Sequence, residues 1–106
     1  MEVKAWKSGL FSKRSVTYGI RIGAENRDRH FRREWTSIAI QTDDGSAVEV
    51  PLTAGFWRHC PEMRHAFFGD WFTNHRLVPW PPGRPPTFDL EFISGNRFTL
   101  KRLPER

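Results

Sequence analysis

Apolar and polar residues alternate along several short stretches of the chain, as they do in half-buried β-strands. The run from Val16 to Ile22 alternates strictly, and Gly19 falls on its polar, outward side. A missing side chain at that position would let another backbone or a ligand come close. The stretch Val3–Lys7 is shorter and more mixed in character, and it predicts an edge strand.

Two further pairs of alternating runs flank turn sequences. Residues 35–42 and 47–52 flank Asp43-Asp44-Gly45-Ser46, and residues 88–92 and 97–101 flank Ser94-Gly95-Asn96. Each pair predicts a β-hairpin, because apolar residues on both sides of a glycine-containing turn can pack on one face. We expect the inward residues of all these strands to share one core. They are Ile20, Ile22, Ile38, Ile40, Val48, Val50, Leu90, Phe92, Phe98 and Leu100.

Only one stretch, Cys60–Leu77, has the length and the periodicity of a full α-helix. Pro61 suits a first helical position, because its missing N–H would have no partner there. Apolar residues cover well over half of the helix circumference, so we expect strands to wrap it on more than one side. Phe67 and Trp71 are then its main contributions to the core. Thr53 is a suitable cap for a short helical turn just before it.

Five prolines fall within residues 78–86, called here the Pro-rich segment, and they predict an extended, polyproline-like crossing. We expect Trp80 and these prolines to cover the open end of the core, and Trp6, Trp57 and Trp71 to pack in the core or at its boundary. The alternative is that the PxxP spacing from Pro82 to Pro85 is a ligand for a proline-recognising domain.

Together these elements predict an α+β fold. In it a small antiparallel, open barrel-like sheet of about six strands, arranged in hairpins, wraps one main α-helix. A chain of 106 residues is long enough for one core and too short for two, so we expect a single domain over residues 1–106.

Basic residues are concentrated in one part of the chain. Between Phe11 and Trp35, seven basic residues stand against three acidic ones, which accounts for +4 of the formal net charge of +5. We expect residues 23–34 to form an exposed loop with at most one helical turn. A local concentration of arginine indicates an anionic partner more strongly than a basic total does.

From this loop the sequence predicts a small nucleic-acid-binding domain, with DNA and RNA both open. Guanidinium groups bind phosphate oxygens in pairs, and an exposed indole gives a base a stacking platform worth roughly 1–3 kcal/mol. If the strands that flank the loop pair, then Arg21 and Trp35 share its surface. The predicted binding residues are Lys13, Arg14, Arg21, Arg27, Arg29, Arg32, Arg33 and Trp35.

Other interpretations of the basic loop and of the whole chain stay open. Glu25, Asp28 and Glu34 could pair locally with the arginines and leave a solvated face. The chain could be a protein-interaction module or complex subunit that uses the Pro-rich segment, an edge strand, or the basic loop against an acidic protein. It could also be a small ribonuclease or toxin-like enzyme with His30 or His59 as general base. No second acid or base is placed by spacing, so we expect no catalytic residue.

Metal and cofactor sites are not expected. No CxxC or HxxxH pattern is present, and His65 and His75 would lie about 15 Å apart along one helix. The single cysteine, Cys60, excludes an internal disulfide and is expected to be buried at the helix entry. The charged stretch after Met1 and the lack of a long apolar run predict a soluble, cytoplasmic protein without a membrane partner.

Overall fold

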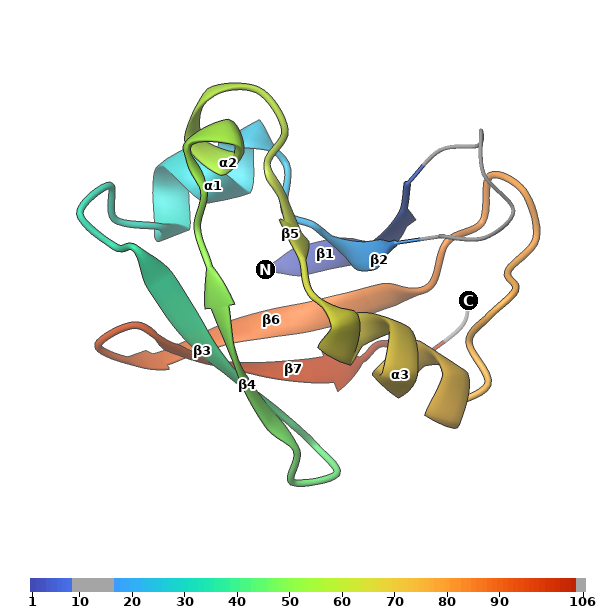
Figure 1. Ribbon diagram of the computed structural model, residues 1–106. Helices are drawn as coiled ribbons and strands as arrows, with labels where there is room; N and C mark the ends of the chain where they lie inside the picture. Colours follow the sequence, from blue (N-terminus) through green and yellow to red (C-terminus); the bar gives the residue numbers. More distant parts are fainter. Residues whose placement is uncertain (9–16, 105–106) are drawn as a thin grey trace.

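The computed structural model describes residues 1–8 and 17–104, which form seven strands and three helices (Figure 1). The strands are β1 (Glu2–Lys7), β2 (Tyr18–Arg21), β3 (Ser37–Thr42), β4 (Ala47–Pro51), β5 (Glu62–Arg64), β6 (Thr87–Ser94) and β7 (Arg97–Arg102). The helices are α1 (Ala24–His30), α2 (Ala54–Arg58) and α3 (Ala66–Asn74). The mixed α and β class is confirmed, whereas the prediction of six strands around one main helix was wrong.

All seven strands belong to one sheet, in the order β4-β3-β7-β6-β1-β2-β5. Its two edge strands, β4 and β5, come close together, so the sheet curls into a nearly closed barrel (Figure 1). Both predicted hairpins, β3–β4 and β6–β7, are present, and they join through β3 and β7. That junction is parallel, whereas the sequence predicted an antiparallel sheet. β1 lies between β6 and β2, so its prediction as an edge strand was wrong.

The predicted helix Cys60–Leu77 is divided in the structure. Residues 62–64 form β5, which pairs with β2, and the helix begins only after His65. The Nδ1 atom of His65 accepts a hydrogen bond from the Phe67 N–H at 3.1 Å, which caps the new helix start. Cys60 is exposed rather than buried, because it lies in the connection before β5.

The core fills the inside of the barrel, between α1 and α2 at one end and α3 at the other. Most predicted inward residues are buried, but Val48 is half-buried and Phe92 is 48% exposed. Phe92 was wrongly predicted because the last four residues of β6 extend past the end of the core. On α3 the most buried side chains are Phe68, Trp71 and Phe72, and Phe67 is only half-buried.

Two groups of segments cover the two ends of the barrel (Figure 1). At one end, α1 and α2 place Phe31 and Phe56 in the core, with their ring centroids 5.3 Å apart. Thr53 caps α2 as predicted, since its Oγ1 accepts a hydrogen bond from the Phe56 N–H. At the other end, the rings of Phe72 in α3 and Trp80 pack edge to face, with their centroids 6.1 Å apart. Trp80 therefore covers the core as expected.

The Pro-rich segment turns back on itself rather than running as a continuous polyproline helix. The Arg84 N–H donates to the Pro81 carbonyl at 3.0 Å, and Gly83 has a φ of 75°. The turn lies between Pro82 and Pro85. A proline-recognising domain binds two prolines at this spacing only when the segment between them is an extended polyproline helix. The geometry therefore favours a covering role over the PxxP-ligand alternative.

Gly19 lies where two strand backbones come unusually close, as its outward position in the sequence predicted. A Cβ atom built on Gly19 would collide with the Met63 carbonyl of β5. We expect Gly19→Ala to cost about 1–3 kcal/mol of unfolding free energy, because β5 must move away from β2. Urea unfolding measures this loss.

A matched control for that substitution is Gly55→Ala in α2. There the nearest atom to a built Cβ is Thr53 Oγ1 at an ordinary 3.6 Å, and alanine favours a helix by up to about 1 kcal/mol over glycine. Gly55→Ala should therefore be neutral or stabilising. Equal behaviour of the two variants would contradict the close approach of β5 to Gly19.

Within residues 1–8 and 17–104, no helix combines the length and the apolar character needed to cross a membrane.

Candidate nucleic-acid interface

Most of the predicted arginine loop is helical. Residues 24–30 form α1, and Gly23 precedes it with a φ of 85°, a conformation that glycine adopts without strain. Glu25 in the first turn and Arg27, Arg29 and His30 in the last turn all complement the helix dipole. The prediction of a loop with at most one helical turn therefore underestimated the order of this segment.

Arg27 joins α1 to α2 instead of facing solvent. Its side chain is only 12% exposed, and its Nη1 donates to the Phe56 carbonyl of α2 at 3.1 Å. Its Nε donates to Asp28 Oδ1 at 3.0 Å. Because one guanidinium nitrogen bonds to α2 and another to Asp28 within α1, Arg27 has a structural role here and does not belong to an exposed binding surface.

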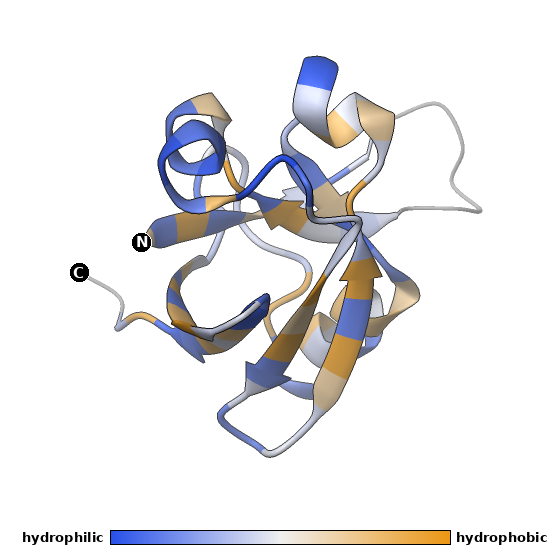
Figure 2. Ribbon diagram, turned by 90° about the vertical axis from the view of Figure 1, so that its left-hand side faces the viewer, coloured by the Kyte–Doolittle hydropathy of each residue, from blue (hydrophilic) through white to orange (hydrophobic). Residues whose placement is uncertain are grey.

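The other arginines of this region lie outward on the same end of the barrel. The side chains of Arg29 and Arg33 are 71% and 70% exposed, and Arg32 is also exposed. The Arg33 guanidinium lies 5.3 Å from the ring centroid of Trp57 in α2, beside exposed Arg58. Figure 2 shows α1 and the segment after it as mostly hydrophilic. We call this surface the α1–α2 ridge: Arg29, Arg32, Arg33, Trp57 and Arg58.

Nearby carboxylates only partly neutralise the ridge. Arg29 Nε lies 3.7 Å from Glu25 Oε1, and Arg33 Nη2 lies 3.9 Å from Asp28 Oδ1. Ion pairs this exposed contribute about 0.2–1 kcal/mol, so a phosphate can replace the carboxylate at little cost. Within the described residues, no ion pair is found for Arg32 or Arg58. Local pairing with carboxylates, the alternative interpretation of this segment, therefore accounts for some of its arginines and not for all.

Trp35 is not the exposed platform that the sequence predicted, although its backbone N–H donates to the Arg32 carbonyl at 3.0 Å. It precedes β3, is half-buried, and packs edge-on against Phe31 and Phe98 with ring centroids 6.0 Å away in both cases. Its outer neighbour is exposed Phe92, which lies nearly parallel at 6.5 Å. The aromatic ring that accompanies the arginines is Trp57, which sequence reasoning assigned to the core boundary.

The remaining predicted binding residues do not join the ridge directly. Arg21 is exposed at the end of β2, but β2 pairs with β1 and β5 and not with β3. The pairing that would have placed Arg21 beside Trp35 is therefore absent. Lys13 and Arg14 lie outside the described residues.

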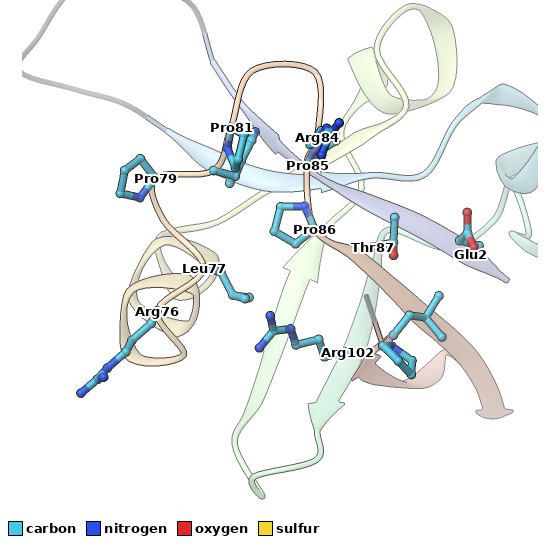
Figure 3. A pocket seen from close by; sticks show the side chains of 13 residues that line it. Glu2, Arg76, Leu77, Pro79, Pro81, Arg84, Pro85, Pro86, Thr87 and Arg102 are labelled. Atoms are coloured by element: carbon cyan, nitrogen blue, oxygen red, sulfur yellow. The ribbon is translucent and has the colours of Figure 1, made fainter. Parts of the chain in front are cut away.

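A hollow of about 840 Å³ lies at the opposite end of the barrel, which sequence reasoning missed (Figure 3). Its walls come from the continuous stretch 76–87, which follows α3 and includes the Pro-rich segment, together with Glu2 of β1 and residues 102–104 at the end of β7. Three arginines belong to its lining, although the Arg76 side chain points away from the hollow in Figure 3. Among the described residues of the lining, Glu2 is the one acidic residue, and none is a histidine or cysteine. The arginines are Arg76, Arg84 and Arg102.

The histidines do not form an acid–base pair with a neighbouring residue on the ridge. His30 ends α1 and His59 follows α2, and both are exposed. Neither side chain makes a hydrogen bond to another described residue. In the described part of the chain, no group of three or more His, Cys, Asp or Glu side chains could hold a metal ion.

Asp44 stabilises the β3–β4 turn. The Thr42 hydroxyl and the Ser46 N–H donate to its carboxylate, and Nε2 of His75, the residue that follows α3, lies 3.0 Å from its Oδ2. These hydrogen bonds, that of Thr42 first, hold the pKa of Asp44 well below its usual range. The carboxylate therefore holds the β3–β4 turn together and joins it to the residue that follows α3.

The chain matches no protein-family model, and no curated protein or solved structure is significantly similar to it. A function therefore has to be inferred from the chain's own residues.

Proposed function

We propose that this protein binds nucleic acid through the α1–α2 ridge. The observation that supports this most strongly is the exposed group of Arg29, Arg32, Arg33 and Arg58 at one end of the barrel. Guanidinium groups bind phosphate oxygens through paired, charge-assisted hydrogen bonds. A net charge of +5 would also attract a polyanion over a longer range. No cofactor or metal is needed for this function, and DNA and RNA fit it equally.

Trp57 gives the ridge a second property. A guanidinium held over an aromatic ring loses less conformational freedom on binding, while the N–H donors at its edge stay accessible. Arg33 in contact with the Trp57 ring is arranged in this way. We infer that Arg33 makes the best-ordered phosphate contact of the ridge.

A second candidate is a protein-interaction module, as the hairpin β6–β7 suggests. Phe92 and Ile93 near its turn are 48% and 49% exposed, which is unusual for large apolar side chains. A partner docked there would make apolar contacts, and its binding would depend little on salt. Neither the Pro-rich segment nor an arginine would be needed for it.

The salt dependence of binding tests the proposed function. We expect labelled oligonucleotides to bind at low salt, with log K falling linearly with log salt. Four ridge contacts correspond to a slope of about −3, because each neutralised phosphate contributes roughly 0.7 for single strands and 0.9 for duplex. Fluorescence anisotropy over a range of salt concentrations measures this slope. No binding at low salt would refute the proposal and favour the protein-interaction candidate.

The same incubation examines the enzymatic alternative. A small ribonuclease would shorten labelled RNA, and His30→Ala or His59→Ala would abolish the cleavage. We expect the oligonucleotides to remain intact. Cleavage that either substitution abolishes would replace the binding proposal with a catalytic one.

A further inference from the structure

The outward side of β1, β2 and β5 forms a second basic surface beside the ridge. Directly paired residues of antiparallel strands point to the same face, and so do residues two apart along a strand. The row Ala5, Ile20 and Met63 points into the core. The rows on either side of it therefore point outward. They are Lys4, Arg21 and Glu62 in one row, and Trp6, Gly19 and Arg64 in the other.

Trp6 is the central feature of this surface, called here the β1–β2–β5 face. Sequence reasoning placed Trp6 in the core or at its boundary, yet it lies in the outward row of β1 and is only half-buried. Among the described residues, it is not one of the side chains that pack against the core. The Arg64 guanidinium lies over its ring, 4.7 Å from the centroid.

Gly19 separates Trp6 from Arg64 in the strand register, and its lack of a side chain brings them together. A Cβ atom on Gly19 would collide with the Met63 carbonyl, so a side chain there would push β5, and Arg64 with it, away from β2 and Trp6. The result is a stack in which the exposed Arg64 guanidinium lies over the indole, so that the outer face of the guanidinium is the planar surface open to a base. Lys4 and Arg21, both exposed, lie in the neighbouring row.

We propose that the β1–β2–β5 face stacks an unpaired base on Trp6 and Arg64, so that the ligand is a single-stranded nucleic acid. This inference rests on the proposed function and specifies its ligand. Bases in a duplex are stacked on one another and cannot reach a side-chain platform, whereas those of a single strand can. Arg64 accompanies the indole as a second planar group for the base.

The β1–β2–β5 face adjoins the ridge, so one strand of nucleic acid can cross both. Arg21 is three residues before the start of α1. Asn26 of α1 donates to the Glu2 and Ile22 carbonyls at 3.1 Å, which fixes the helix at the ends of β1 and β2. Phosphates on the ridge would therefore direct the next nucleotides toward Arg21 and Trp6. Stacking there adds preference for single strands to an affinity that comes mainly from the arginines.

The test compares a fluorescein-labelled oligothymidylate with a duplex of equal length, using wild type and Trp6→Ala. We expect Trp6→Ala to weaken single-strand binding about 5- to 150-fold and to change duplex binding less than about twofold. The slope of log K against log salt should stay the same, because no charge is removed. Trp6→Phe should restore most of the affinity, since it keeps an aromatic ring. The urea midpoint of Trp6→Ala should match that of wild type.

Phe92→Ala is the matched control, because Phe92 is an exposed aromatic residue outside this face. It should leave single-strand binding unchanged. If wild type binds and Trp6→Ala binds single strands equally well, the stacking inference fails while the proposed function stands. An equal loss for single strands and duplex would also overturn it. Binding of neither ligand by wild type would refute both.

Discussion

Replacing Phe72 by alanine is expected to lower the unfolding free energy by about 3–5 kcal/mol. Phe72 is fully buried on α3, and its ring lies parallel to that of Phe88 with centroids 5.7 Å apart. It also contacts Tyr18 of β2 and Trp80 of the Pro-rich segment. Truncation would leave a cavity where α3, two strands and the covering segment meet, and close-packed neighbours can fill it only partly.

Phe67 provides the matched control, because it is a phenylalanine on the same helix and is only half-buried. Its replacement by alanine should cost about half as much or less, since less apolar surface is lost from the core. Urea unfolding at a constant m-value measures both losses. A larger loss for Phe67→Ala than for Phe72→Ala would mean that α3 presents a different side to the sheet.

Local patterns predicted the elements whose partners are close in sequence. The β3–β4 hairpin formed as expected, because alternating residues flank the turn Asp43–Ser46 and nothing distant competes for them. The prediction of one helix over Cys60–Leu77 was wrong because part of this stretch pairs with a segment that is distant in sequence. Residues 62–64 pair with β2, about forty positions earlier in the chain, and no window of local sequence contains both partners. The pairing of β5 with β2 therefore outweighed the helical spacing of apolar residues in this stretch.

The arginine run predicted an exposed basic surface but could not assign roles within it. Arg27 and Arg29 are two residues apart on α1, and only the position of α2 decides which of them is buried. The aromatic residues were harder still. Trp35 lies in an alternating run yet packs at the end of the core, whereas Trp6 lies in a short, mixed run and points outward. Their faces depend on which strands become neighbours in the sheet.

The two ends of the barrel differ in a way that bears on function. At the α1–α2 end, the largely covered side chain of Arg27 links two short helices, and the arginines around it remain exposed. At the α3 end, aromatic rings and prolines cover the core, and the cations are spread over three segments. Phosphates along a strand are evenly spaced, so a cluster of cations on adjoining elements suits them better than scattered ones. This difference allows a direct comparison between the ends.

Reversing Arg29, Arg32 and Arg33 to glutamate is expected to weaken nucleic-acid binding roughly 100-fold or more. Each lost charge-assisted contact corresponds to about 1–2 kcal/mol of binding free energy. Three such losses together weaken binding by more than about 100-fold. The slope of log K against log salt should flatten by about 2–3, because three fewer phosphates are neutralised. The loss should be similar for every oligonucleotide sequence, since phosphates carry no base identity.

The matched control reverses Arg76, Arg84 and Lys101, three exposed cations at the α3 end of the barrel. Both triple variants bring the formal net charge from +5 to −1, so long-range attraction falls equally in the two. The ridge variant should nevertheless lose much more affinity than the control. Similar losses would indicate diffuse attraction by net charge and no binding site on the ridge.

Reversal also places glutamates beside Glu25 and Asp28, which could weaken α1 through repulsion between like charges. The triple glutamine variant at Arg29, Arg32 and Arg33 removes the positive charges without adding that repulsion. It should keep the wild-type urea midpoint and still flatten the salt slope by about 2–3. If the glutamine variant binds as wild type does, the arginines of the ridge do not contact phosphates. Any loss seen in the glutamate variant would then reflect a disturbed helix.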